Sequence, residues 1–103
     1  MIGLAGHGDR RRDAHEHQHR RHQEAAAERG MVDSQYNLAR LYEIGGGVPS
    51  DPARAYQWYL VAGRQGDEGA EEAAARLRAD IPATSRLEAE AEAERFLSDA
   101  VQG

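Results

Sequence analysis

The sequence predicts an all-α protein, an α-solenoid fragment of stacked helix-turn-helix units. A set of small and apolar residues recurs 36 positions further along the chain, and a period in this range is typical of such units. The set comprises Ala26, Gly30, Ser34, Leu38 and Leu41, which recur as Ala62, Gly66, Ala70, Ala74 and Leu77. Apolar residues around these positions follow the three- and four-residue spacing of helices. Stacked helix pairs of this kind mostly present binding surfaces.

The first complete helix of the repeat is expected to start near Asp33, whose carboxylate can accept hydrogen bonds from the free N–H groups of a first turn. Leu38, Leu41 and Tyr42 then share one face of that helix. The glycines at 45–47 end it, because glycine adopts the left-handed conformation of a helix C-terminus without strain.

The next helix is expected to open at Asp51 and Pro52, with the aspartate as N-cap and the proline in the first turn. Small and aromatic residues share its apolar face, namely Ala55, Trp58, Tyr59 and Ala62. We expect the two aromatic side chains to fill the space between closely packed helices. Gly66 and Asp67 then break the chain, and a further helix follows over 67–79.

A last helix is expected over 85–101, within a C-terminal segment that spans 80–103. Pro82 ends the preceding helix, and Ser85 and Glu88 have the spacing of a capping box. Its apolar positions recur every three or four residues, at Ala89, Ala93, Phe96, Leu97, Ala100 and Val101. A helix with one apolar and one acidic face suits the capping of a solenoid.

The N-terminal part of the chain has a different composition from the repeats at 25–79. Residues 1–9 show no periodicity and little apolar bulk, so we expect them to be a disordered tail. Residues 10–24 are rich in arginine and histidine and form an expected helix of uncertain origin. That helix is either a polar N-terminal cap or a stretch that does not belong to the parent solenoid.

Histidines in this segment raise the alternative of a metal-binding module. In a helix, His15, His19 and His22 lie on one face, and imidazole nitrogens at that spacing can share a zinc, nickel or copper ion. No carboxylate or cysteine pattern completes the set, so the favoured interpretation contains no metal site.

Composition excludes several functional classes. The chain has 103 residues, which is one domain at most, and it contains no cysteine for a disulfide or a thiolate zinc site. The formal net charge is −5, and residues 67–94 hold nine acids against three arginines, so a nucleic acid partner is not expected. No apolar run is long enough for a membrane span, and no signal peptide is recognisable. All basic residues are arginine, which favours a GC-rich, bacterial source.

Catalytic patterns are also missing from the sequence. The serines fall at helix starts, turns and helix ends, and none has a histidine nearby in the sequence. The glycines at 45–47 follow a helix and lack the Lys-Ser/Thr pair of a phosphate loop. We therefore predict that the protein is not an enzyme and carries no cofactor.

The repeat resembles the Sel1-like repeat, a relative of the tetratricopeptide repeat. Over roughly 25–78, the small residues, the glycine loop before Val48, Asp51 and the Trp58-Tyr59 pair fall in the order typical of that family. One full unit and half of another match. The chain departs from the pattern at Ala39, where the family usually has glycine, and at Gly63, where it usually has alanine.

The resemblance implies a scaffold or adaptor that binds a protein or peptide, as related repeats do in bacterial signalling, envelope processes and host interaction. It also implies that the outer side of the helix over 33–44 lines the contact groove. The partner-binding residues expected there are Tyr36, Asn37, Arg40 and Glu43. A third possibility is purely structural, namely a truncated tail whose partner is the rest of a longer solenoid.

Overall fold

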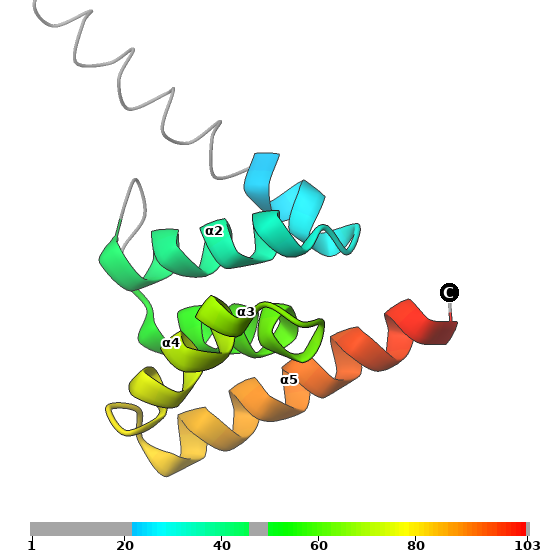
Figure 1. Ribbon diagram of the computed structural model, residues 1–103. Helices are drawn as coiled ribbons and strands as arrows, with labels where there is room; N and C mark the ends of the chain where they lie inside the picture. The colour runs from blue at the N-terminus through cyan, green and yellow to red at the C-terminus, as the bar shows by residue number, and fades with distance from the viewer. Residues whose placement is uncertain (1–21, 46–49, 103) are drawn as a thin grey trace, which may run out of the picture.

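The computed structural model describes residues 22–45 and 50–102, and this part consists of helices joined by short turns, with no strand (Figure 1). A short helical stretch covers residues 22–28. Four helices follow, in the order α2 (Val32–Ile44), α3 (Pro52–Arg64), α4 (Glu68–Arg78) and α5 (Ala83–Gln102). The predicted all-α solenoid class is confirmed. Among the described helices, none combines the length and the apolar character needed to cross a bilayer.

Three of the predicted helix ends are confirmed by their capping contacts. Gly45 ends α2 in the left-handed conformation, with φ of 76°, and its N–H donates to the carbonyl of Leu41. Asp51 caps α3, since its carboxylate accepts a hydrogen bond from the backbone N–H of Arg54. Asp67 caps α4 in the same way. Each of these caps depends only on residues close together in the sequence, so the sequence pattern locates them.

Helix α2 starts next to the expected position, but the predicted capping role of Asp33 is wrong. The helix begins at Val32 with Met31 as its N-cap, and no side chain caps it. The turn before it determines this start, because Gly30 has a φ of 93° and the backbone of Met31 is extended. The carbonyl of Met31 accepts the first helical hydrogen bond, from the N–H of Gln35. Asp33 instead lies in the first turn, where its negative charge interacts favourably with the helix dipole.

Helix α5 also starts before its predicted first residue, Ser85. It begins at Ala83, directly after Pro82, whose carbonyl accepts a hydrogen bond from the N–H of Arg86. Proline fixes its own φ at a value compatible with a helix start and has no N–H that would need a partner, so it suits the position before the first turn. Of the predicted apolar positions in α5, Ala89 and Ala93 are buried.

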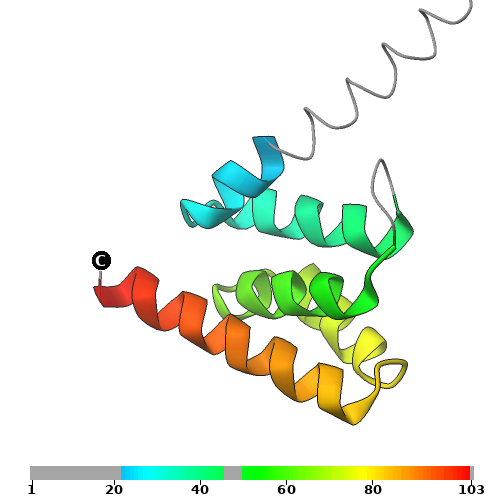
Figure 2. The ribbon, with the colours of Figure 1, turned by 180° about the vertical axis from the view of Figure 1, so that it is seen from behind.

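Helix α3 is the centre of the fold. It packs against α2, α4 and α5. Figures 1 and 2 show α2 and α5 on opposite sides of α3, with α4 in front of it in the first view and behind it in the second. Trp58 and Tyr59 are 9% and 2% exposed, which confirms the expected core role of this pair. The rings of Trp58 and Phe96 meet edge to face, with centroids 5.3 Å apart, so α5 packs on α3 through an aromatic contact.

The structure reaches only the end of the predicted N-terminal helix. Residues 22–28 are helical, and buried Ala27 packs them into the core. The hydroxyl of Tyr42 donates a 3.3 Å hydrogen bond to Glu24 and connects this stretch to α2. The expected tail at 1–9 and most of the segment at 10–24 lie outside the described residues, so the division into segments stays a prediction.

Candidate interaction surface

All four predicted contact residues lie on α2, and they differ in how the rest of the fold engages them. Asn37 and Arg40 are exposed, as the helical spacing predicts. Tyr36 and Glu43 are half-buried. The face that carries these four side chains is called the α2 face below.

Tyr36 is held at the junction of three helices. Its ring meets that of Tyr59, on α3, edge to face with centroids 5.6 Å apart. Gly69, near the start of α4, lies so close that an added Cβ would sit 3.6 Å from the Tyr36 ring. The ring therefore has a fixed orientation, and its remaining surface contributes to the α2 face.

Glu43 is engaged by two partners within the protein. Its Oε1 accepts a 2.7 Å hydrogen bond from the hydroxyl of Tyr59, and its Oε2 accepts one of 2.7 Å from Arg76, on α4. The hydrogen bond from Arg76 is the main reason that the pKa of Glu43 lies below its ordinary value, and desolvation opposes that shift. Glu43 thus joins the ends of α2 and α4 and fixes Arg76 beside the α2 face.

Arg76 was not among the residues predicted for this surface. Its side chain remains 58% exposed, and the hydrogen bond to Glu43 uses only one of its guanidinium nitrogens. The 36-residue repeat could have identified it, because Arg76 occupies the position in the second unit that Arg40 has in the first.

Arg40 provides the second cation of the α2 face. Within the described part of the chain, it forms no hydrogen bond or ion pair, although its charge contributes to the lowered pKa of Glu43. The guanidinium group keeps its planar set of five donors available for a partner.

A buried amide behind the α2 face fixes the position of α2. Gln35 is 0% exposed, its Nε2 donates a 3.1 Å hydrogen bond to the carbonyl of Ala27, and its Oε1 accepts one of 2.7 Å from Gln65. These bonds connect the 22–28 stretch, α2 and the end of α3. The role of Gln35 could not be predicted from the sequence, because a glutamine in a periodic helix pattern is interpreted as a surface residue.

The alternative metal site gains no support. His22 is an exposed residue of the 22–28 stretch, whereas His15 and His19 lie outside the described residues. Across residues 22–45 and 50–102, no group of three histidine, cysteine or acidic side chains could hold a metal ion.

Comparison with known proteins found one family match. Residues 32–67, which run from the start of α2 to the residue before α4, match the family model described as Sel1 repeat. Comparisons with curated proteins and with solved structures gave no match. The match lies within the stretch of roughly 25–78 in which the sequence resembles the family, and it ends at residue 67.

Proposed function

We propose that this chain, whose residues 32–67 match the Sel1 repeat, is a non-catalytic adaptor that binds another protein along the α2 face. Sel1 repeats are generally protein-interaction modules. The proposed contact residues are Tyr36, Asn37, Arg40 and Glu43. Arg76 extends the same surface on α4. The proposal includes no metal, no cofactor and no nucleic acid partner.

The observation that carries the proposal is the arrangement of Arg40 beside an oriented ring. Arg40 is exposed and makes no ion pair within the described residues, while Tyr36, one turn earlier, is fixed by its contact with Tyr59. A guanidinium can hold a carboxylate through two parallel hydrogen bonds, and a tyrosine ring adds apolar contact area. Because the Tyr36 ring is already ordered, its binding to a partner costs little side-chain entropy, which favours association.

The chemistry of this surface indicates a segment that carries a carboxylate. Glu43 is half-buried and already bound to Tyr59 and Arg76, so it presents little free negative charge. Asn37 can donate and accept hydrogen bonds with the backbone of an extended partner. As a proposed contact residue, Glu43 also positions Arg76 at the edge of this surface, through the hydrogen bond between their side chains.

The proposal is tested with affinity capture by the purified chain, followed by identification of the bound proteins and measurement of binding to the recovered partner. The variants Arg40→Ala and Tyr36→Ala are expected to weaken binding to that partner. Arg95→Ala is the matched control, because Arg95 is an exposed arginine on α5, which lies on the side of α3 opposite α2. Circular dichroism first confirms that every variant is folded.

The result that contradicts the proposal is equally specific. If Arg40→Ala and Tyr36→Ala retain every partner at the affinity of the unmodified chain, the α2 face is not the binding surface. The same conclusion follows if Arg95→Ala weakens binding as much as Arg40→Ala does.

A further inference from the structure

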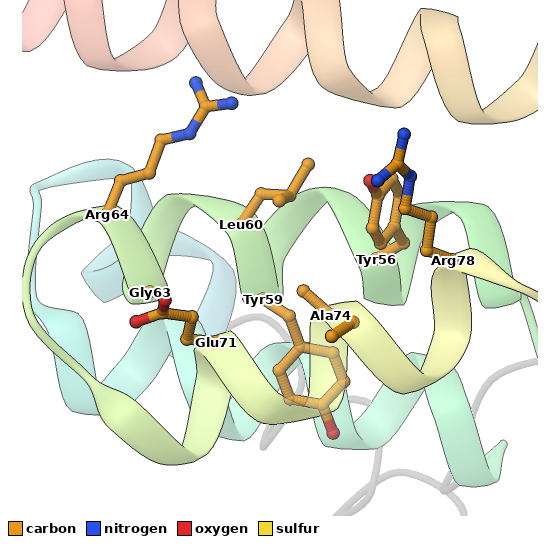
Figure 3. A pocket seen from close by; sticks show the side chains of 9 residues that line it. Tyr56, Tyr59, Leu60, Gly63, Arg64, Glu71, Ala74 and Arg78 are labelled. Carbon is orange, nitrogen blue, oxygen red and sulfur yellow. The ribbon is translucent and has the colours of Figure 1, made fainter.

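A cavity of about 350 Å³ lies between α3 and α4, on the side of α3 that faces α5 (Figure 3). Leu60, Gly63, Ala74 and Ala75 give it a wall of small and apolar groups. Its volume is at the low end of the range for ligand sites in proteins, about 300–1,000 Å³. The cavity is thus large enough for one long side chain and too small for an extended ligand.

Both arginines at the edge of this cavity already have partners on α5. Arg64 forms a 3.0 Å ion pair with Glu94. Arg78 lies 3.9 Å from Glu90, which also accepts a 2.6 Å hydrogen bond from the hydroxyl of Tyr56. Glu94 and Glu90 therefore offset part of the positive charge that Arg64 and Arg78 bring to the cavity.

Glu71 is the remaining charged residue that lines the cavity. It is exposed, and in the part of the chain that the structure describes its side chain has no hydrogen-bond or ion-pair partner. Figure 3 shows it next to Gly63, at one end of the cavity. An added Cβ on Gly63 would lie only 3.1 Å from the backbone of Glu71, so α3 and α4 are in close contact at this end. An uncompensated carboxylate therefore stands beside an apolar wall.

We propose that this cavity receives an arginine or lysine side chain from a basic segment of a protein partner. The aliphatic stem packs on Leu60, Ala74 and Ala75, and the charged head pairs with Glu71. The elements beside the cavity also carry an excess of negative charge, because residues 67–94, which include α4 and the first part of α5, contain nine acids and three arginines. An excess of negative charge attracts cationic segments and increases the rate at which they associate. This site lies apart from the α2 face, so it is a second contact beyond the proposed adaptor surface.

The test is an NMR titration of the full chain with the peptide acetyl-Gly-Arg-Gly-Arg-Gly-amide. Amide signals of Leu60, Gly63 and Ala75 are expected to shift. The matched peptide contains citrulline in place of arginine, which keeps the stem and removes the charge, and it is expected to bind more weakly. A peptide with glutamate in place of arginine is expected to cause no shift at these amides.

Two variants separate the cavity from general charge attraction. Glu71→Gln is expected to weaken binding of the arginine peptide by about two- to fivefold, the range for an exposed ion pair. Glu72→Gln removes the same charge from the neighbouring position, which does not line the cavity, and is expected to change the affinity by less than about twofold. Ala75→Phe fills the cavity without changing the charge and is expected to abolish the shifts at Leu60 and Gly63.

Three results would overturn the proposal. The first is an equal loss of affinity in Glu71→Gln and Glu72→Gln, which would show general attraction to acidic helices. The second is equal binding of the citrulline peptide. The third concerns the chain without any peptide, in a variant whose arginines at 10–12 and 20–21 are replaced by glutamine. A shift of the amide signals of Leu60, Gly63 and Ala75 in that variant would show that the cavity is occupied by this chain's own N-terminal segment.

Discussion

The hydroxyl of Tyr59 donates a 2.7 Å hydrogen bond to Oε1 of Glu43 and so connects the buried centre of α3 to the outer edge of α2. Burial, followed by the hydrogen bond to this carboxylate, raises the pKa of Tyr59 above its ordinary value. The phenol is therefore a neutral donor to a charged acceptor, which is a stronger type of hydrogen bond than one between two neutral groups.

Replacing this donor should measurably destabilise the protein. Tyr59→Phe removes the hydroxyl and keeps the ring, so the free energy of unfolding is expected to fall by about 1–2 kcal/mol. Urea unfolding followed by circular dichroism measures the change. Tyr36→Phe is the control, because no hydrogen bond of the Tyr36 hydroxyl is present in the described residues, and it should stay within about 0.5 kcal/mol. Equal losses in the two variants would show that the Tyr59 hydrogen bond adds no stability.

The ion pair between Glu43 and Arg76 should make stability depend on pH in the acidic range. The pKa of Glu43 is lower in the folded protein than its ordinary value of 4.5, so the folded state binds the proton less readily than the unfolded chain does. The stabilising contribution is complete above that ordinary value and is lost as the pH falls through the folded pKa. The free energy of unfolding should exceed that of Glu43→Gln at about pH 7, and the difference should shrink by about pH 3. A difference that stays constant between these two pH values would contradict the assignment.

Trp58 should be the most sensitive single position in the core. It is 9% exposed and meets Phe96 edge to face across the contact between α3 and α5. Trp58→Ala is expected to lower the free energy of unfolding by about 3–5 kcal/mol, as deletion of a buried aromatic usually does. Phe96→Ala should have a smaller effect, because Phe96 is only half-buried. A thermal melt of Trp58→Ala close to that of the unmodified chain would contradict the packing.

The buried amide of Gln35 should be costly to remove despite its polarity. Gln35→Ala removes both hydrogen bonds, although the carbonyl of Ala27 still accepts from the N–H of Gly30 and the amide of Gln65 still donates to the carbonyl of Val61. The expected loss is about 1–3 kcal/mol, because two hydrogen bonds are lost, each contributing about 0.5–1.5 kcal/mol. Asn37→Ala, at an exposed position of the same helix, should stay within about 0.5 kcal/mol in the same urea experiment. A neutral Gln35→Ala would show that water replaces both bonds.

Two glycine substitutions should have effects of opposite sign. Gly63→Ala places a Cβ 3.1 Å from the backbone of Glu71, so α3 and α4 must move apart and the protein should lose about 1 kcal/mol or more. At Gly69 the nearest atoms would be 3.4 Å or further from the new Cβ. Gly69→Ala should therefore gain about 0.5–1 kcal/mol from helix propensity. Thermal melts of both variants measure these changes in stability. Stabilisation by Gly63→Ala would show that α3 and α4 can separate at Gly63 and Glu71 at little cost.

The helix class and most helix ends could be predicted because they depend on neighbouring residues. Gly45, Asp51 and Asp67 act within one turn of their own positions, so their roles follow from residue type and spacing. The start of α2 depends instead on the backbone conformation of Gly30 and Met31, which the residue types around Asp33 do not indicate.

The candidate surface was predictable only in part. Helical spacing placed Asn37 and Arg40 on the outside, and both are exposed. The partners of Glu43 come from α3 and α4, and the partners of Gln35 come from the 22–28 stretch and the end of α3. Contacts between helices distant in the sequence depend on how those helices pack, and a periodic pattern carries no such information.

The central place of α3 has a consequence for how this protein loses its structure. In a long array of repeats that touch only their neighbours, one end can unravel while the rest stays folded. Here α2, α4 and α5 each pack on α3, which is their main helix contact in the part of the chain that the structure describes. Once α3 unfolds, the remaining helices lose their main packing surface together. We therefore expect melting to be a single cooperative transition, as in small globular domains, rather than the stepwise fraying of a solenoid.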